Sequence, residues 1–130
     1  MGDKYLIDTS AVIKYLSNVL PKKGATFVDQ IVDGQCTISF ISEIELQVWE
    51  SPKKEDILVF LDFIKASDII IVNHDIIQKT IEIRKKFRLK LPDAVIAATA
   101  MVYGLTLISD NDKDFVKVAG MKYVNPMKIN

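Results

Sequence analysis

The sequence predicts an α/β domain in which a mainly parallel sheet is covered by helices on both faces. Short apolar runs typical of buried strands alternate along the whole chain with longer amphipathic segments typical of helices. The chain has 130 residues, of which 49% are hydrophobic, and it contains only five Gly and four Pro. This composition predicts one compact domain spanning residues 1–130, with no segment that resembles a disordered tail.

Six elements are predicted in the first half of the chain from apolar periodicity and from breaks at Gly and Pro. They are a buried strand over residues 5–7, helices over 11–20 and 25–32, a β-branched strand over 36–41, and helices over 42–50 and 54–65. Ser42 and Glu45 match the capping box S-x-x-E, which would begin the helix at Ser42. The apolar stripe of the helix over residues 54–65 is expected to be Ile57, Leu58, Leu61 and Ile64.

The second half of the chain continues the same alternation. The expected elements are a strand over residues 69–72, helices over 75–87 and 93–103, a strand over 105–108, a short helix or turn over 113–118, and a strand over 122–124. Ile77 and Ile81 recur at helical spacing in the first of these helices, and Pro92 suits the first turn of the second. The single histidine, His74, is expected to be a helix-start residue rather than a catalytic base.

Acidic residues stand at or just inside the start of four predicted helices. They are Asp8, Glu45, Asp93 and the run Asp110, Asp112 and Asp114. In a parallel α/β sheet the helix starts gather at the carboxyl edge of the strands, so these side chains should meet there. Carboxylates that meet repel one another unless a cation lies among them. The pattern therefore predicts a divalent-metal site.

Each acid also has a purely structural interpretation when taken alone. Asp8 could cap a helix together with Ser10, and Asp93 could be stabilised by the helix dipole in a first turn. The Asp110 run could form a turn. For Glu45 a capping role alone is insufficient, because its helical neighbours Ile41, Val48 and Trp49 are apolar and would turn it inward. A carboxylate on an apolar stripe needs a compensating partner.

A basic segment precedes Asp93 directly. Its five basic residues in seven positions are Arg84, Lys85, Lys86, Arg88 and Lys90. The formal net charge is zero, so any nucleic-acid binding must come from such a local patch. We expect this segment to lie at the rim of the acidic edge and to bind phosphates; the alternative is a solvated helix end.

Several other functional classes do not fit the motifs. Asp8 has no adjacent acid and no lysine ends the strand over residues 105–108, unlike a response-regulator receiver. The D-x-D-x-T opening of aspartate-nucleophile phosphatases and the G-x-x-x-x-G-K phosphate loop are both absent. Cys36 is the only cysteine, so no internal disulfide can form. With no signal peptide and no apolar run near the roughly 20 residues of a membrane span, a cytoplasmic protein without membrane contact is expected.

Four segments together resemble the PIN-domain ribonucleases, and most closely the VapC-type toxins of toxin–antitoxin pairs. In the family's order they are LIDTSAVI, ISFISEIEL, LKLPDAVIAATAMVYGLTLIS and DNDKDF, and they span nearly the whole chain. The resemblance implies a three-layer α/β/α fold and an endoribonuclease that uses one or two Mg²⁺ or Mn²⁺ ions to activate water. The implied ligands are Asp8, Glu45, Asp93 and, by register, Asp112, with Asp110 as an added ligand and Ser10 in a supporting role.

The same resemblance implies partners and leaves alternatives. It implies an RNA substrate, a small antitoxin that holds the toxin inactive, and a homodimer. One alternative is an RNA-processing PIN nuclease without an antitoxin, which a missing antitoxin reading frame upstream would favour. The other is a non-catalytic PIN-like module that binds RNA or protein, against which the intact acids argue.

Overall fold

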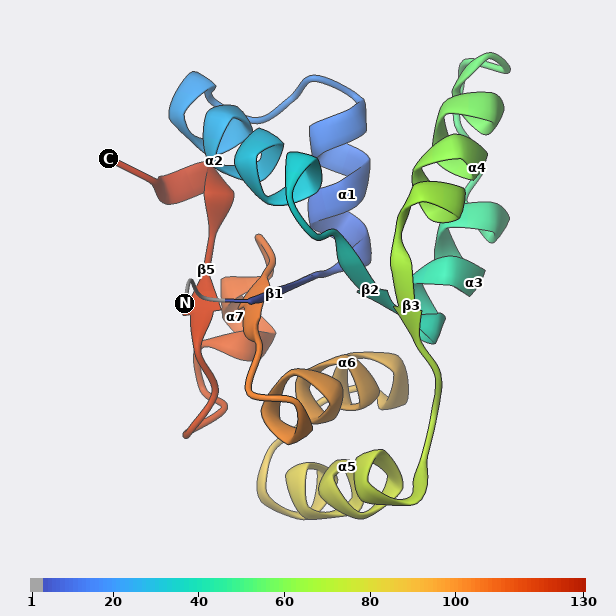
Figure 1. Ribbon diagram of the computed structural model, residues 1–130. Coiled ribbons are helices and arrows are strands. Elements are labelled where there is room, and N and C mark those ends of the chain that lie inside the picture. The colour runs from blue at the N-terminus through green and yellow to red at the C-terminus, as the bar shows by residue number, and fades with distance from the viewer. Residues whose placement is uncertain (1–3) are drawn as a thin grey trace.

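A computed structural model describes residues 4–130 and shows helices on both sides of a small sheet (Figure 1). The strands are β1 (Tyr5–Ile7), β2 (Thr37–Ser39), β3 (Asp68–Ile70), β4 (Thr106–Ile108) and β5 (Tyr123–Val124). The helices are α1 (Thr9–Leu16), α2 (Lys22–Asp33), α3 (Phe40–Val48), α4 (Asp56–Ala66), α5 (His74–Lys86), α6 (Leu91–Val102), α7 (Asp112–Phe115) and the 3₁₀ helix η1 (Pro126–Lys128). The order of strands and helices follows the predicted one.

The strands pair in parallel throughout the described residues. β4 lies between β1 and β5, with Leu6 opposite Leu107, and β2 pairs with β3, with Ile38 opposite Ile69. β1 also packs beside β2, so the two ladders form one central layer in the order β3, β2, β1, β4, β5. The predicted mainly parallel central sheet is confirmed.

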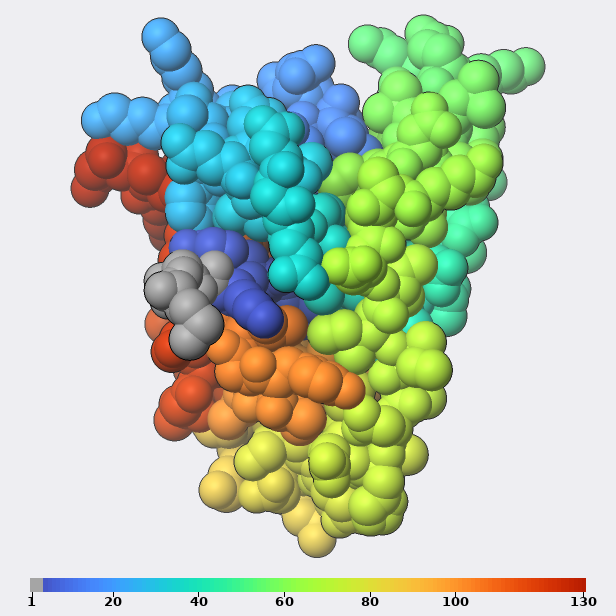
Figure 2. Space-filling view, in the orientation of Figure 1, coloured from blue at the N-terminus to red at the C-terminus, as the bar shows by residue number. Residues whose placement is uncertain are grey.

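A hydrophobic core fills the space on each face of this central layer. Leu6 and Leu107 point into a core shared with α5, α6 and α7, whereas Ile7 and Ile108 point into a core shared with α1, α2 and α4. Burial on both faces is typical of parallel sheets, and every residue of β2 and of β4 is buried. The predicted three-layer α/β/α arrangement is therefore confirmed. Helices α2 and α5, which pack on different faces of the central layer, lie at opposite ends of the molecule in Figure 2.

The start of α3 differs from the sequence-based expectation. α3 begins at Phe40, because Ser39 is its N-cap and the Ser39 Oγ accepts a hydrogen bond from the Ile41 backbone N–H. The predicted capping box at Ser42 is therefore wrong. Ser42 is the third residue of the helix and is fully buried, which leaves Glu45 free of a capping role.

The exposed faces of α4 and α5 carry more apolar side chains than their periodicity suggested. On α4 the predicted stripe residue Leu58 is 68% exposed, while Phe60 and Phe63 are buried in its place. On α5 the helical spacing of Ile77 and Ile81 correctly marked a helix, but both side chains are exposed and Ile76 and Ile83 face the core. Both helices therefore present isoleucine or leucine to solvent.

α6 is the most apolar helix of the fold and packs against α5. All seven residues over 94–100 are buried, including Ala94, Ile96 and Thr99. Its 12 residues fall short of the roughly 20 that a bilayer span requires. Over residues 4–130, none of the helices combines the length and the apolar character that a membrane crossing needs.

Candidate metal centre

Four carboxylates line one open pocket of about 740 Å³ at the carboxyl ends of the strands. Asp8 follows β1 directly, Asp110 lies two residues beyond β4, Glu45 comes from the middle of α3, and Asp93 lies in the first turn of α6. The pocket is completed by Thr9, Ser10, Ile13, Ile44, Val48, Trp49 and Asn111. The convergence that topology predicted for these four acids is present in the structure.

Asp8 is the most deeply buried of these acids, with 5% of its surface exposed. Its backbone N–H donates to the Ile108 carbonyl, so the strand pairing of β1 with β4 fixes its position. Ser109 Oγ donates to Asp8 Oδ2 at 2.8 Å, and Ser10 Oγ lies 3.2 Å from the same oxygen. Burial raises the pKa of Asp8 to about 6; the Ser109 bond opposes this rise and repulsion from Asp93 adds to it.

Glu45 is half-buried and accepts a hydrogen bond from Thr9 Oγ1 at 2.6 Å on its Oε1. Thr9 Oγ1 also lies 2.9 Å from Ser42 Oγ, so a pair of hydroxyls links α1 to α3 at this point. Of the expected inward neighbours of Glu45, Ile41 packs against the core, but Val48 and Trp49 do not, because they are 72% and 38% exposed. They form the apolar wall of the pocket instead.

Asp93 is half-buried beside two further acids. Burial raises its pKa, and repulsion from Asp114 and then from Glu45 adds to the rise, while the nearby Lys90 opposes it. Asp114, from α7, therefore lies near enough to Asp93 to act on its charge, although it is not among the residues that line the pocket. Asp114 accepts a hydrogen bond from Asn111 Nδ2 at 2.9 Å.

Asp110 differs from these acids because a cation contacts it. Lys14 Nζ forms an ion pair with Asp110 Oδ2, and Ser10 Oγ donates to Oδ1 at 2.6 Å. Burial alone would raise the pKa of Asp110, but the bonds from Lys14 and Ser10 outweigh it and hold the pKa below its ordinary value. Both carboxylate oxygens of Asp110 are therefore engaged within the protein.

Asp112 stands outside the lining of this pocket. Lys128 Nζ contacts its Oδ2, and Oδ1 accepts hydrogen bonds from Tyr123 Oη at 2.6 Å and Asn125 Nδ2 at 3.0 Å. The Lys128 bond, followed by those of Tyr123 and Asn125, lowers the pKa of Asp112 to about 2. The structure therefore places the expected fourth ligand in a network with the C-terminal segment rather than with Asp8, Glu45 and Asp93.

Sequence reasoning missed the hydroxyl groups that hold the acids in place. Thr9 and Ser109 each lie next to a predicted acid, and each donates to a carboxylate of the pocket. The signal was present, because hydroxyl residues flank the acids in IDTS and LISD. The role of Lys14 had no such signal, since it meets Asp110 only through the fold.

The donor chemistry of the pocket fits a hard divalent cation. Asp8, Glu45 and Asp93 offer carboxylate oxygens, which Mg²⁺ and Mn²⁺ prefer, and within residues 4–130 no Lys or Arg forms an ion pair with any of them. Across that part of the chain, the side chains as placed do not bring three His, Cys, Asp or Glu groups around one point. The pocket therefore offers donor atoms of the kind that such a cation prefers, but within residues 4–130 these side chains do not converge on one point.

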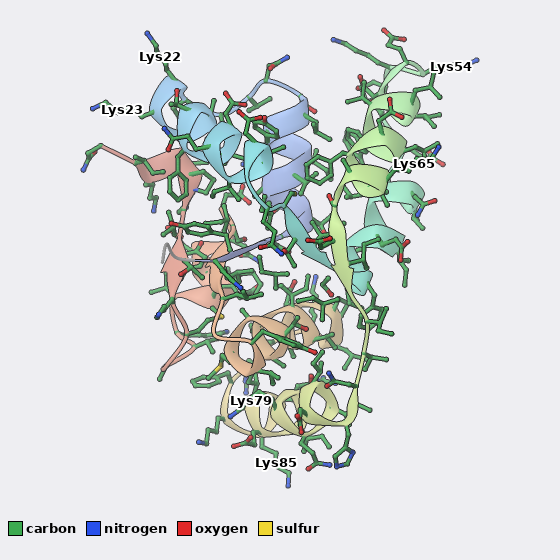
Figure 3. The ribbon with its side chains drawn as sticks, viewed as in Figure 1. Lys22, Lys23, Lys54, Lys65, Lys79 and Lys85 are labelled. Atoms are coloured by element: carbon green, nitrogen blue, oxygen red, sulfur yellow. The ribbon has the colours of Figure 1, made fainter. Side chains whose placement is uncertain are left out.

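The basic segment lines a shallow groove of about 510 Å³ that adjoins the acids. Arg84, Arg88 and Lys90 line it together with Asp114, the residue whose charge acts on Asp93. All five basic side chains of the segment are exposed, and Lys85 projects from the outer face of α5 in Figure 3. Asp114 therefore relates this groove to the acids, and phosphate binding by the basic segment stays a prediction.

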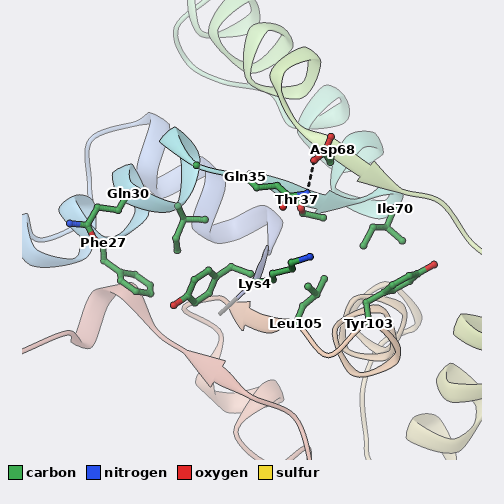
Figure 4. Close-up of a pocket in the computed structure, with 12 residues that line it drawn as sticks. Lys4, Phe27, Gln30, Gln35, Thr37, Asp68, Ile70, Tyr103 and Leu105 are labelled. Carbon is green, nitrogen blue, oxygen red and sulfur yellow. Dashed lines mark hydrogen bonds between the residues drawn. The ribbon is translucent and has the colours of Figure 1, made fainter. Parts of the chain in front are cut away.

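A second pocket, of about 680 Å³, opens at the opposite edge of the sheet (Figure 4). Lys4 precedes β1 there, Thr37 begins β2, and Tyr103 and Leu105 lie just before β4. Among its lining residues Asp68 is the single acid, and it accepts a hydrogen bond from Gln35 Nε2 at 3.1 Å. This pocket lacks the grouped carboxylates that define the candidate site.

The raised pKa of Asp8 predicts a pH-dependent stability for the metal-free protein. An acid with a folded-state pKa of about 6 and an ordinary value of 3.8 lowers stability when ionised. That cost, of about 3 kcal/mol, is fully present above pH 6 and disappears as the pH falls toward 4. Urea unfolding in EDTA should therefore show Asp8→Asn to be more stable than the wild type at pH 7, with the difference shrinking at pH 5. A difference that stays constant with pH would contradict the assigned burial of the charge.

Comparisons with known proteins show which family and fold this chain shares. A family model described as PIN domain matches residues 5–121. The toxin–antitoxin complex from Klebsiella pneumoniae contains a chain with 31% identity and a TM-score of 0.78, the match covering 97% of this chain and 100% of that one. VapBC2 from Rickettsia felis, bound to a promoter DNA fragment, matches at 25% identity and a TM-score of 0.76, over 93% and 97% of the two chains. A search of curated proteins finds no match.

Proposed function

Because this chain belongs to the PIN-domain family, we propose that it is a divalent-metal-dependent endoribonuclease that acts as the toxin of a toxin–antitoxin pair. The observation that carries the proposal is the buried carboxylate of Asp8, which stands with Asp93 and Glu45 in one pocket and forms no ion pair within residues 4–130. Charges in this setting favour a bound cation.

We assign the metal to Asp8, Glu45 and Asp93. Asp110 and Asp112, which the sequence also offered, each have a lysine partner in the structure, namely Lys14 and Lys128. A carboxylate that is already neutralised gains less from a second cation, because its first partner must be displaced. Support for the assignment comes from the raised pKa values of Asp8 and Asp93 against the lowered values of Asp110 and Asp112.

The residues of the chain itself have defined tasks in this reaction. When bound, Mg²⁺ or Mn²⁺ supplies a Lewis acid for the phosphodiester and lowers the pKa of water. Ser109 and Ser10 hold the Asp8 carboxylate, and Thr9 holds that of Glu45, so the ligand oxygens keep fixed directions. His74, on the outer end of α5, has no part in this scheme.

RNA must approach a pocket that is itself negatively charged. We propose that Arg84, Arg88 and Lys90, which line the groove beside Asp114, bind phosphates next to the cleaved bond. Lys85 and Lys86 would add to the local positive potential from the end of α5. The charge pattern, with basic side chains at the rim and acids inside, supports a path along this groove into the pocket.

The proposed protein partners are a small antitoxin and a second copy of the chain. The Klebsiella pneumoniae relative is part of a toxin–antitoxin complex, and the exposed apolar wall of Ile44, Val48 and Trp49 beside the acids suits a protein segment that blocks the pocket. An antitoxin reading frame next to the gene separates this function from antitoxin-free RNA processing. Light scattering that gives a monomer mass would rule out the homodimer.

The function is tested by RNA cleavage with the purified protein. Cleavage of single-stranded RNA is expected with Mg²⁺ or Mn²⁺, and EDTA should abolish it because the ligand acids cannot act alone. Added Mn²⁺ should also raise the melting temperature by binding the folded state. Absence of cleavage with either metal, together with no thermal shift, would leave only the non-catalytic binding module as an explanation.

A further inference from the structure

Lys14 lies beside the acidic pocket and forms an ion pair with Asp110, one of the residues that line it. It follows Ser10 by four residues on α1, so the two side chains share one face of the helix. Both contact Asp110: Lys14 Nζ pairs with Oδ2 and Ser10 Oγ donates to Oδ1. Among the ion pairs of residues 4–130, this one alone involves a carboxylate of the pocket lining.

The pair divides the pocket into two electrostatic parts. Asp8, Glu45 and Asp93 form a part whose negative charge is not compensated by a paired cation within residues 4–130. The side-chain hydrogen bonds to Asp8 and Glu45 come from neutral hydroxyl groups. Lys14 and Asp110 form a formally neutral part that is linked to Asp8 through Ser10. The Lys14 side chain remains 36% exposed, so its charge also acts on the solvent side of the pocket.

We propose that Lys14 is a positioning residue that sets the charge balance of the acidic pocket, limiting its affinity for a divalent cation while easing the approach of RNA phosphates. The inference rests on the proposed function of the pocket. Lys14 acts through Asp110 and through its field rather than by contact with the reacting atoms. The reaction needs such a balance, because the same acidic pocket must bind a divalent cation and also admit an RNA phosphate.

Opposite effects on the two ligands distinguish this role from a structural one. Removing the Lys14 charge makes the pocket more negative, which attracts a cation more strongly and repels a phosphate more strongly. Local misfolding would weaken the binding of both ligands. The direction of the two changes, more than their size, therefore tests the proposal.

The experiment compares Lys14→Met with the wild type in two binding measurements. Calorimetry with Mn²⁺ alone should show affinity increased by roughly three- to tenfold, and fluorescence anisotropy with a short labelled single-stranded RNA in EDTA should show affinity reduced by a similar factor. Lys14→Arg should keep both wild-type values. Lys23→Met removes the same charge from α2, at a residue that neither lines the acidic pocket nor pairs with an acid within residues 4–130, and it should change neither affinity. Lys23 is labelled in Figure 3.

Two further variants complete the test. The double variant Lys14→Met with Asp110→Asn replaces one neutral pair by another, so both affinities should return close to those of the wild type. Arg88→Ser removes a proposed phosphate contact from the groove and should weaken RNA binding alone. If Lys14→Met changes both affinities in the same direction, or neither, the proposal is overturned. If the wild type itself binds neither Mn²⁺ nor RNA, the proposed function of the pocket fails, and the proposal for Lys14 fails together with that function.

Discussion

Replacing Asp93 by Asn is expected to lower kcat/KM for RNA cleavage by at least about 100-fold, because it removes a charge that we assign to the metal. Asn keeps the size of the side chain and one carbonyl oxygen, so the first turn of α6 should be retained. The variant also relieves repulsion with Asp114 and Glu45, and its melting temperature in EDTA should match or exceed that of the wild type. Cleavage assays and thermal unfolding on the same preparation check both parts.

Asp112→Asn is the matched control for this substitution. It removes a charge of the same kind from an acid whose oxygens are bound by Lys128, Tyr123 and Asn125. We expect activity within about fivefold of the wild type, since this network orders the chain near Asp110 without supplying a ligand. Activity lost as fully as in Asp93→Asn, at an unchanged melting temperature, would show that Asp112 is the fourth ligand after all.

Replacing Gly24 by Ala is expected to destabilise the fold by about 2–3 kcal/mol, or roughly 10 °C in melting temperature. A Cβ atom at Gly24 would lie 1.9 Å from the Pro126 carbonyl oxygen, because α2 packs directly on η1 there. Backbone atoms form the obstacle, so one of the two elements must move. In an open helix the same change would stabilise by about 1 kcal/mol, which makes the sign of the effect diagnostic.

Gly34→Ala provides the comparison for that prediction. The Cβ of an alanine at residue 34 would meet its nearest atom, the Gln30 carbonyl oxygen, at an ordinary 3.5 Å. Thermal unfolding should therefore give a melting temperature close to that of the wild type. If Gly24→Ala were as stable as Gly34→Ala, the close contact between α2 and η1 would be contradicted.

The order of elements could be predicted because parallel strands are buried on both faces. The runs over residues 5–7 and 105–108 are apolar except for Thr106, and β1 and β4 lie in the middle of the sheet with Leu6 and Ile7 in separate cores. Helix faces were harder to assign. α5 carries isoleucines on two sides, and periodicity alone could not tell that Ile76 faces the core while Ile77 faces solvent.

The candidate site was predictable where topology decides position and unpredictable where single contacts do. Asp8 and Asp93 meet because one follows a strand and the other begins a helix at the same edge. The cationic partners of Asp110 and Asp112 are Lys14 and Lys128, which meet these acids only after the chain has folded. Such pairs leave no local pattern, so the fourth ligand could not be chosen from sequence.

The parallel pairing of β1 with β4 also determines when a growing polypeptide could become active. Asp8 is held by the Ile108 backbone and by Ser109, residues that are made about a hundred positions later. Contacts between such distant segments form late in folding. A chain that stops before β4 would lack both the floor of the pocket and Asp110, so unfinished translation products should be inert. Under the proposed function, the ability to cut RNA would therefore arise only after synthesis of the chain is nearly complete.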